Sequence, residues 1–216
     1  MRRSTRVTII RHGESQCTVD GIVGGTKGCT GLSMEGRRQA ELLRDRLLQT
    51  GELATTDVVL TSVLPRAIET ATIISPGVGD GDLEVLQDCD LCELHPGECD
   101  GMTWTDYSER YGHIDMRADP YAAISPGGES VAGFVVRVGG ALRRAVDRYE
   151  GQQIVIVAHG GVIQSSFRAF GNLPIQTGID IEPSNTSLTE WAGVRSDDGT
   201  YCWLLVRYND FAHLSY

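Results

Sequence analysis

Two histidines in this chain share one local setting, in which an apolar, β-branched run ends in a polar turn with glycine. Residues 7–10 are followed by Arg-His-Gly at 11–13, and residues 154–158 by His-Gly-Gly at 159–161. Runs of this composition are typical of buried strands. Each histidine is therefore expected at the carboxyl end of a strand, where open α/β sheets bind their ligands. An imidazole there can act as a nucleophile, an acid or a base near neutral pH.

Two arginines could supply the positive charge that a phosphate group requires. Arg11 belongs to the first of these turns, and Arg66 follows Pro65 soon after a third apolar run at 57–62. Proline is favoured in the first turn of a helix, so Arg66 is expected near a helix N-terminus, where free backbone amides favour an anion. Guanidinium groups offer phosphate planar, paired donors. The alternative for Arg66 is a surface position paired with Glu69.

A carboxyl group and a glycine-rich loop are further candidates. Glu93 lies between Cys92 and Leu94, and a carboxyl in apolar surroundings suits a general acid. A half-exposed structural glutamate is the commoner role for such a residue. Residues 21–31 are rich in glycine and lack an apolar period, which predicts a loop whose backbone amides could approach an anion.

One cluster resembles a set of metal ligands. Cys89, Cys92, His95 and Cys99 follow one another closely, as in a short zinc knuckle. The spacings are tight and no second Cys-x-x-Cys pair appears, so we expect cysteines of loop and core here rather than a metal site.

The elements that must position these groups follow from hydrophobic periodicity and from capping residues. We expect one helix from Ser33 to Gly51, one from Pro65 to Ile74, and two more that end near Tyr149 and Phe170. Strands are expected at 7–10, 57–62, 83–86, 154–158, 187–191 and 202–206. Residues 95–128 are expected to be irregular, a lid-like insert within a single domain that spans 1–216.

Composition narrows the class of function. The 216 residues fit one large domain, and a net charge of -10 disfavours nucleic acid and anionic membranes as partners. The apolar run behind the basic residues 1–6 is too short for a signal peptide or a membrane span. Six cysteines are too few for a disulfide framework. We expect a cytoplasmic protein; the sequence leaves its oligomeric state open, a homodimer included.

Taken in chain order, these motifs resemble those of the histidine phosphatase superfamily, the phosphoglycerate mutase-like proteins. The resemblance extends over nearly the whole chain. The matching residues are Arg11–Ser15, Gly31–Ser33, Gly36, Gln39, Ala40, Thr61, Ser62, Arg66, Ala67, Thr70, Ala71, Leu91, Glu93, Gly97, Glu98, Gly101, Gly127–Ser130, His159–Gly161 and Asn185–Ser187.

The resemblance implies a three-layer α/β/α domain with a mostly parallel central sheet and a phosphate pocket at the carboxyl ends of its strands. It implies that His12 is the nucleophile and that Glu93 protonates the leaving oxygen. Arg11, Arg66 and His159 would hold the phosphate. These three groups can stabilise the charge of phosphoryl transfer without a metal, so we expect neither a metal nor a cofactor.

Three further residues are predicted to contribute to substrate binding, namely Thr18, Gly24 and Gly160. Thr18 stands where many members of the family have Asn, and it can still donate a hydrogen bond over a shorter reach. Mutases tend to carry Trp beside the glycine of the loop, where this chain has Gly25 after Gly24, and they tend to have a longer insert before the second histidine. Both departures favour a phosphatase.

We therefore predict a metal-independent phosphomonoesterase that acts on a small phosphorylated metabolite through a phosphohistidine. A mutase that returns the phosphoryl group to a second hydroxyl is the first alternative. A non-catalytic protein that binds a phospholigand is the second, and it ranks lower because a binder would not need Glu93.

Overall fold

A six-stranded sheet forms the centre of the molecule in the computed structural model, which describes residues 3–112, 115–116, 118–176 and 179–214. Its strands are β1 (Thr5–Arg11), β2 (Val58–Thr61), β3 (Val85–Gln87), β4 (Gln153–Ala158), β5 (Leu188–Arg195) and β6 (Tyr201–Asp210). They lie in the order β3-β2-β4-β1-β5-β6. The first four are mutually parallel, whereas β5 runs antiparallel to β1 and β6 antiparallel to β5.

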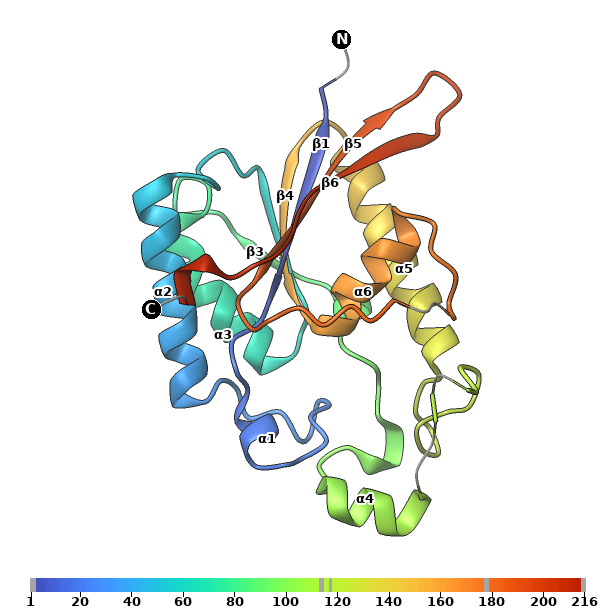
Figure 1. Ribbon diagram of the computed structural model, residues 1–216. Helices are drawn as coiled ribbons and strands as arrows, with labels where there is room; N and C mark the ends of the chain where they lie inside the picture. Colours follow the sequence, from blue (N-terminus) through green and yellow to red (C-terminus); the bar gives the residue numbers. More distant parts are fainter. Residues whose placement is uncertain (1–2, 113–114, 117, 177–178, 215–216) are drawn as a thin grey trace.

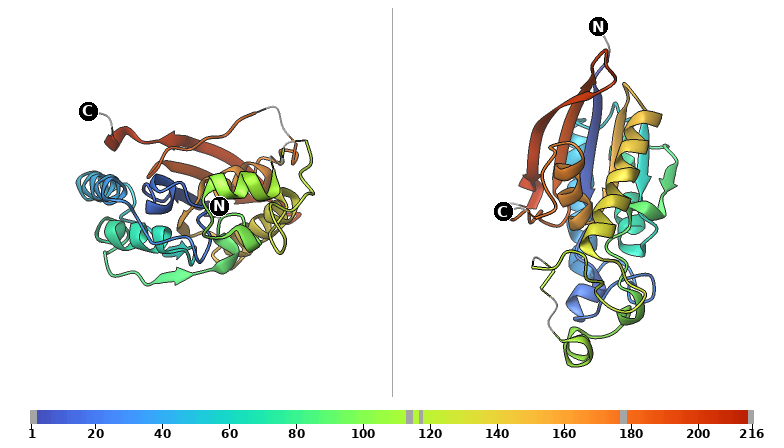
Figure 2. Two further views of the ribbon diagram at one scale, coloured as in Figure 1. Left: turned by 90° about the horizontal axis from the view of Figure 1, so that it is seen from below. Right: turned by 90° about the vertical axis from the view of Figure 1, so that its right-hand side faces the viewer.

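Helices cover both faces of this sheet (Figures 1 and 2). The helices are α1 (Gln16–Val19), α2 (Met34–Thr50), α3 (Pro65–Ile74), α4 (Trp104–Tyr111), α5 (Val131–Arg148) and α6 (Gly160–Ala169). Short 3₁₀ turns lie at Ser75–Gly77, Cys89–Leu91, Gly97–Cys99 and Ala212–Leu214. Helices α2 and α3 pack on one face, and α5 and α6 on the other. The expected three-layer α/β/α fold with a mostly parallel sheet is confirmed.

The two hydrophobic cores follow from the alternation of side chains along the central strands. On β1, Val7 and Ile9 join the cluster beneath α5 and α6, whereas Ile10 joins the cluster beneath α2 and α3. Strand β4 divides its side chains in the same way. Because successive side chains point to opposite faces of a sheet, a continuous apolar run is what a strand covered on both faces requires.

Local signals set the ends of α2 and α3 where the sequence predicts them. The Ser33 side chain accepts a hydrogen bond from the Gly36 amide at 2.9 Å and so caps α2. Gly51 ends that helix in the left-handed conformation with φ 65°, which glycine adopts at little cost. Pro65 is the first residue of α3.

The expectation of an irregular segment at 95–128 needs correction, because α4 lies within it. The Thr103 side chain accepts a hydrogen bond from the Asp106 amide at 3.0 Å, and Tyr107 is the helix's single buried residue. Its hydroxyl donates to the Ile124 carbonyl at 3.0 Å. Trp104, Tyr107 and Tyr111 stand three and four residues apart and their rings contact one another along one face. This short helical period is a signal that the expectation of an irregular segment did not use. The place of α4 as a lid stays a prediction.

Among the described residues, no helix combines the length and the apolar character that crossing a membrane would require.

Two leucines of α2 test how far the packing on this face of the sheet stabilises the fold. Leu43 is completely buried, whereas Leu48 is 56% exposed. We expect Leu43→Ala to lower the free energy of unfolding by about 2–5 kcal/mol, since it removes buried methyl groups and leaves a cavity. Leu48→Ala should change it by less than about 0.5 kcal/mol. Urea unfolding at neutral pH measures both, and equal losses would contradict this account of the core.

Candidate active site

Two histidines meet at the carboxyl edge of the sheet because β1 and β4 are parallel neighbours. The His12 amide donates to the Ala158 carbonyl at 2.9 Å, which fixes the end of β1 against the end of β4. The rings of His12 and His159 lie with their centroids 5.0 Å apart and their planes at 64°. Both side chains are buried. The strand pairing therefore brings together the two turns that the sequence singled out.

The hydrogen bonds of His12 define its tautomer. Nδ1 lies 2.6 Å from the Gly13 carbonyl, which can only accept, and Nε2 lies 3.1 Å from Arg66 Nε, which can only donate. The proton therefore resides on Nδ1 and the lone pair on Nε2. Burial lowers the pKa of His12 well below its usual value, and the positive charge of Arg66 lowers it further. His12 is thus a neutral imidazole whose Nε2 can act as a nucleophile.

Arg66 connects His12 to the glycine-rich loop. The guanidinium is 5% exposed, and its Nη1 donates to the Gly24 carbonyl at 2.7 Å. A Cβ at position 24 would lie 3.3 Å from that Nη1 and 2.4 Å from Cys17 Sγ, so the loop packs here only with glycine. The alternative of a surface Arg66 paired with Glu69 is wrong: Arg66 is buried and Glu69 pairs with Arg37.

Ser62 holds the second histidine. Its Oγ lies 2.7 Å from His159 Nε2 and accepts from the Leu64 amide at 3.1 Å. Burial lowers the pKa of His159 well below its usual value, and the charge of Arg66 adds to this. When the Ser62 hydroxyl donates to Nε2, the proton of the neutral ring resides on Nδ1. That atom is buried without a partner among the described residues, which leaves it as a donor for a ligand.

Arg11 and Glu93 line an open cavity of about 510 Å³ beside the two histidines. Arg11 Nη1 donates to the Pro183 carbonyl at 2.5 Å, and its buried Nε has no partner within the described ranges. The charges of Glu93 and Glu182 act on this guanidinium, although burial is the larger effect and lowers its pKa.

Glu93 is held by backbone amides at the beginning of α6. Its Oε2 accepts from the Gly161 amide at 3.0 Å, and its Oε1 accepts from the Leu94 amide at 3.2 Å. A Cβ at position 161 would lie 2.2 Å from Glu93 Oε1 and 2.8 Å from the Phe134 ring. The second glycine of the His-Gly-Gly turn thus makes room for the carboxylate. Gly160, the first residue of α6, borders the same cavity.

The part of Thr18 in substrate binding stays a prediction. The residue belongs to α1 and is exposed, and its hydroxyl pairs with Ser15 Oγ at 2.8 Å.

Three supporting residues had no role assigned from the sequence. Ser62 orients His159, the Asn185 side chain donates to the His12 carbonyl at 2.9 Å, and the Thr70 hydroxyl accepts from the Gly13 amide at 3.1 Å. Ser62 ends the strand predicted at 57–62, and its position at a strand-to-helix turn is the signal for it. Thr70 lies within the helix predicted from Pro65 to Ile74, where no signal marks it. Asn185 precedes β5 in a stretch without a periodic signal.

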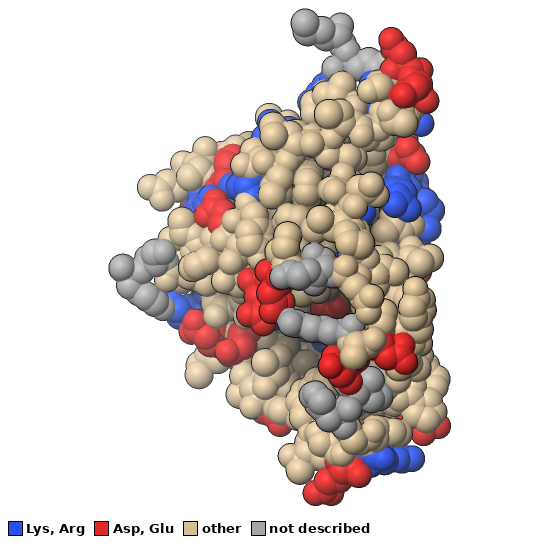
Figure 3. All heavy atoms as spheres, turned by 45° about the vertical axis from the view of Figure 1, so that its right-hand side comes forward, with Lys and Arg blue, Asp and Glu red and all other residues tan. Residues whose placement is uncertain are grey.

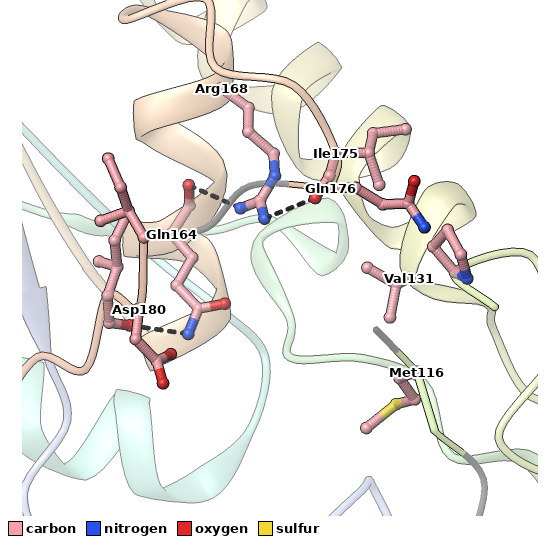
Figure 4. Close-up of a pocket in the computed structure, with 10 residues that line it drawn as sticks. Met116, Val131, Gln164, Arg168, Ile175, Gln176 and Asp180 are labelled. Atoms are coloured by element: carbon pink, nitrogen blue, oxygen red, sulfur yellow. Dashed lines mark hydrogen bonds between the residues drawn. The ribbon is translucent and has the colours of Figure 1, made fainter. Parts of the chain in front are cut away.

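A second cavity of about 450 Å³ adjoins the first through Gln164. It lies between α6, the beginning of α5 and the segment before β5 (Figure 4). Arg168 borders it and donates to the Gln164 and Ile175 carbonyls at 3.1 Å each. Apolar side chains complete the lining, namely Met116, Pro120, Val131, Ile175, Ile179 and Ile181.

Carboxylates gather at this side of the molecule, where Figure 3 shows a hollow with acidic side chains around it. Glu93, Asp180 and Glu182 line the two cavities. An anionic ligand must therefore be attracted by Arg11 and Arg66 against the surrounding charge.

A family model, the histidine phosphatase superfamily (branch 1), matches residues 7–210. The chain belongs to the histidine phosphatase superfamily. Among its curated relatives, phosphoglycerate mutase-like protein 4 of Arabidopsis thaliana is 34% identical over 170 residues, which are 74% of this chain and 69% of the relative. The 2,3-bisphosphoglycerate-dependent phosphoglycerate mutase of Parvibaculum lavamentivorans is 29% identical, with 74% of this chain and 76% of the relative covered.

A solved histidine phosphatase extends the comparison. The mycobacterial glucosyl-3-phosphoglycerate phosphatase in complex with VO3 superposes with a TM-score of 0.77 at 26% identity, over 97% of this chain and 99% of that one. The superfamily and these relatives support an enzyme that acts on phosphate groups.

The two buried imidazoles predict how stability depends on pH. Their pKa values are lower in the folded chain than the value of about 6.5 in the unfolded chain. The unfolded chain therefore binds more protons below that pH, and stability falls as the pH falls. The free energy of unfolding should fall between pH 7 and pH 5.5, and we expect this fall to be smaller by about 1 kcal/mol in His159→Gln than in the natural protein. Urea unfolding in phosphate-free buffer measures it; the same pH dependence in both proteins would contradict a neutral His159.

Proposed function

We propose that this protein is a phosphomonoesterase that transfers the phosphoryl group of a small organic phosphate to His12 and then to water, with no metal in the chemical steps. The observation that carries the proposal is the state of His12, a neutral ring with its Nε2 lone pair facing Arg66. A nucleophile in this state needs no base to remove a proton before it attacks.

The phosphate would lie among Arg11, Arg66 and His159. Arg66 contacts Nε2 of His12, and the buried atoms Arg11 Nε and His159 Nδ1, which have no partner among the described residues, belong to neighbouring strand ends. Phosphoryl transfer requires mainly positioning and stabilisation of charge on the equatorial oxygens. Two guanidiniums and one neutral imidazole donor would position the phosphate and stabilise its charge, in a site whose buried side chains exclude much of the water.

In the first step, Nε2 of His12 forms a bond to phosphorus while the bond from phosphorus to the leaving oxygen breaks. Glu93, protonated beforehand, gives its proton to that oxygen. In the second step, a water molecule attacks phosphorus as Glu93 takes one of its protons, and the bond to Nε2 breaks. Glu93 is half-buried and borders an open cavity, so water can reach the carboxylate that would activate it.

The leaving group would extend into the second cavity. Gln164 borders both cavities, and the second one combines apolar side chains with Arg168 and Asp180. This lining supports a leaving group with both apolar and polar parts. A phosphoglycerate mutase remains the alternative, since several relatives have that name. Such an enzyme would retain the phosphoryl group until a second hydroxyl replaced the first product.

Replacement of the nucleophile tests the proposal directly. We expect His12→Ala to abolish hydrolysis of p-nitrophenyl phosphate in the presence of EDTA, because it removes the imidazole nitrogen that would attack phosphorus. An acid-labile, alkali-stable phosphoryl adduct should form on the natural protein and be absent from His12→Ala. His95→Ala, at a half-exposed histidine, should retain turnover.

Hydrolysis by His12→Ala at the rate of the natural protein would exclude the mechanism. A phosphoenzyme that transfers to phosphoglycerate faster than to water would establish the mutase instead. A folded protein that binds phosphate without forming the adduct would indicate the non-catalytic alternative.

The role of Glu93 predicts a dependence on the leaving group. An alkoxide needs a proton in order to leave, whereas nitrophenolate does not. For the formation of the phosphoenzyme, we expect Glu93→Gln to slow reaction of an alkyl phosphate by about 10²–10⁴ and that of p-nitrophenyl phosphate by less than about 10. Rapid-quench measurements on single turnovers give both rates. Equal losses for the two esters would show that Glu93 does not act as the acid.

A further inference from the structure

Three potential metal ligands converge beside Glu93. Cys89, Cys92 and His95 each offer a ligand atom, and these atoms all lie within 4.8 Å of one another. The 3₁₀ turn at Cys89–Leu91 brings the two cysteines to one side of the chain, and His95 follows from the other side of Glu93. The sequence spacing favoured cysteines of loop and core. The distances between these three ligand atoms favour a metal site instead.

The fourth member of the sequence cluster lies elsewhere. The Cys99 thiol donates to the Pro96 carbonyl at 3.1 Å, and the side chain is buried in a small core with Val23, Tyr107 and Ile124. Cys99 is therefore not a fourth ligand, and the four cluster residues do not form a zinc knuckle. The structure brings together three ligands of the mixed thiolate and imidazole type.

We infer that Cys89, Cys92 and His95 form a binding site for one Zn²⁺ ion outside the phosphate cavity, with the fourth tetrahedral position left to solvent. Two thiolates and a neutral imidazole are a set that zinc accepts readily, and thiolates select it against Mg²⁺ and Ca²⁺. Two negative thiolates balance the charge of the ion, which suits the complete burial of Cys92. Cys89 is exposed, so the ion can enter from that side.

The surroundings hold these ligands in place. Arg137 donates to the carbonyls of Asp90 and Cys92 at 2.9 and 3.1 Å, which fixes the backbone between the two cysteines. It also donates to both oxygens of Glu129 at 2.7 Å. Glu129 in turn accepts from the His95 amide at 3.0 Å. The ligands therefore lose little freedom when a metal binds, which favours affinity.

Glu129 is also placed to act as the carboxylate that usually accepts a hydrogen bond from the second ring nitrogen of a metal-bound histidine. Its Oε2 lies 3.7 Å from His95 Nδ1, and coordination through Nε2 would leave Nδ1–H directed to this carboxylate. Such a carboxylate orients the imidazole and raises its basicity. The ion would then hold the chain on both sides of Glu93, while none of its ligands belongs to the proposed chemical steps.

Cobalt provides the test, because Co²⁺ reports thiolate ligands and tetrahedral geometry in its absorption spectrum. The full chain, reduced with a phosphine and stripped of metal, is titrated with Co²⁺ and then with Zn²⁺. We expect about one equivalent to bind, with thiolate-to-cobalt charge-transfer bands that Zn²⁺ removes. Cys89→Ser, Cys92→Ser and His95→Ala should each weaken binding by more than about 100-fold, and Glu129→Gln by about 10–100-fold.

Two matched controls separate this site from other cysteines. Cys202→Ser replaces an exposed thiol on β6, and Cys99→Ser replaces the buried thiol of the sequence cluster; both should bind Co²⁺ as the natural chain does. Circular dichroism checks that every variant is folded.

Absence of charge-transfer bands in the reduced natural chain would overturn the inference, as would equal binding by Cys89→Ser. Loss of binding in a folded Cys99→Ser would also overturn it, in favour of a rearranged knuckle. Since Cys89→Ser should still hydrolyse p-nitrophenyl phosphate, a failure of the metal site and a failure of the proposed hydrolysis are seen in different measurements.

Discussion

The buried guanidinium of Arg66 is the group on which the rest of the site depends. Removal of a charge from water costs several kcal/mol unless partners replace the water, and Arg66 is 5% exposed. No carboxylate of the described residues forms an ion pair with it. Its partners are the Gly24 carbonyl and the lone pair of His12, both uncharged. A buried positive charge without a carboxylate partner favours an anion.

The same positive charge keeps the histidines neutral. With Arg66 close to both rings, a proton on either imidazole would place like charges together in a dry environment. The neutral rings are then available as nucleophile and as donor. The carboxylates of Glu93 and Glu182 act on Arg11, whereas burial and the charge of Arg66 are the leading influences on the two histidines. The local cluster therefore outweighs the net charge of the chain.

Much of the fold could be predicted because its signals are local. Ser33 marks a helix end through its capping side chain, Gly51 through its freedom to adopt a positive φ, and Pro65 through its fixed φ. The apolar runs at β1 and β4 indicate burial on both faces of the sheet. Helix α4 was missed although Trp104, Tyr107 and Tyr111 follow a helical period, because that signal extends over only eight residues. The antiparallel pairing of β5 with β1 likewise depends on residues far apart in sequence.

The active site could be predicted only in part, because many of its contacts join residues that are far apart in the sequence. Residue types at strand ends indicated His12 and His159, since parallel strands end at a common edge. The contact between Glu93 and the Gly161 amide joins residues 68 positions apart, and spacing alone could not distinguish the metal-like triad from Cys99. Pairwise geometry of this kind is fixed by the packing of whole elements.

The close fit of Gly161 against Glu93 has a consequence for related sequences. A side chain at this position would occupy the space of the carboxylate oxygen and of the Phe134 ring. The second glycine after the histidine is therefore a marker of where the carboxylate lies, rather than of phosphate contact. A homologue that carries a larger residue here must have moved its carboxylate, its α5 or both, and such a substitution in an alignment would point to altered chemistry even where both histidines are retained.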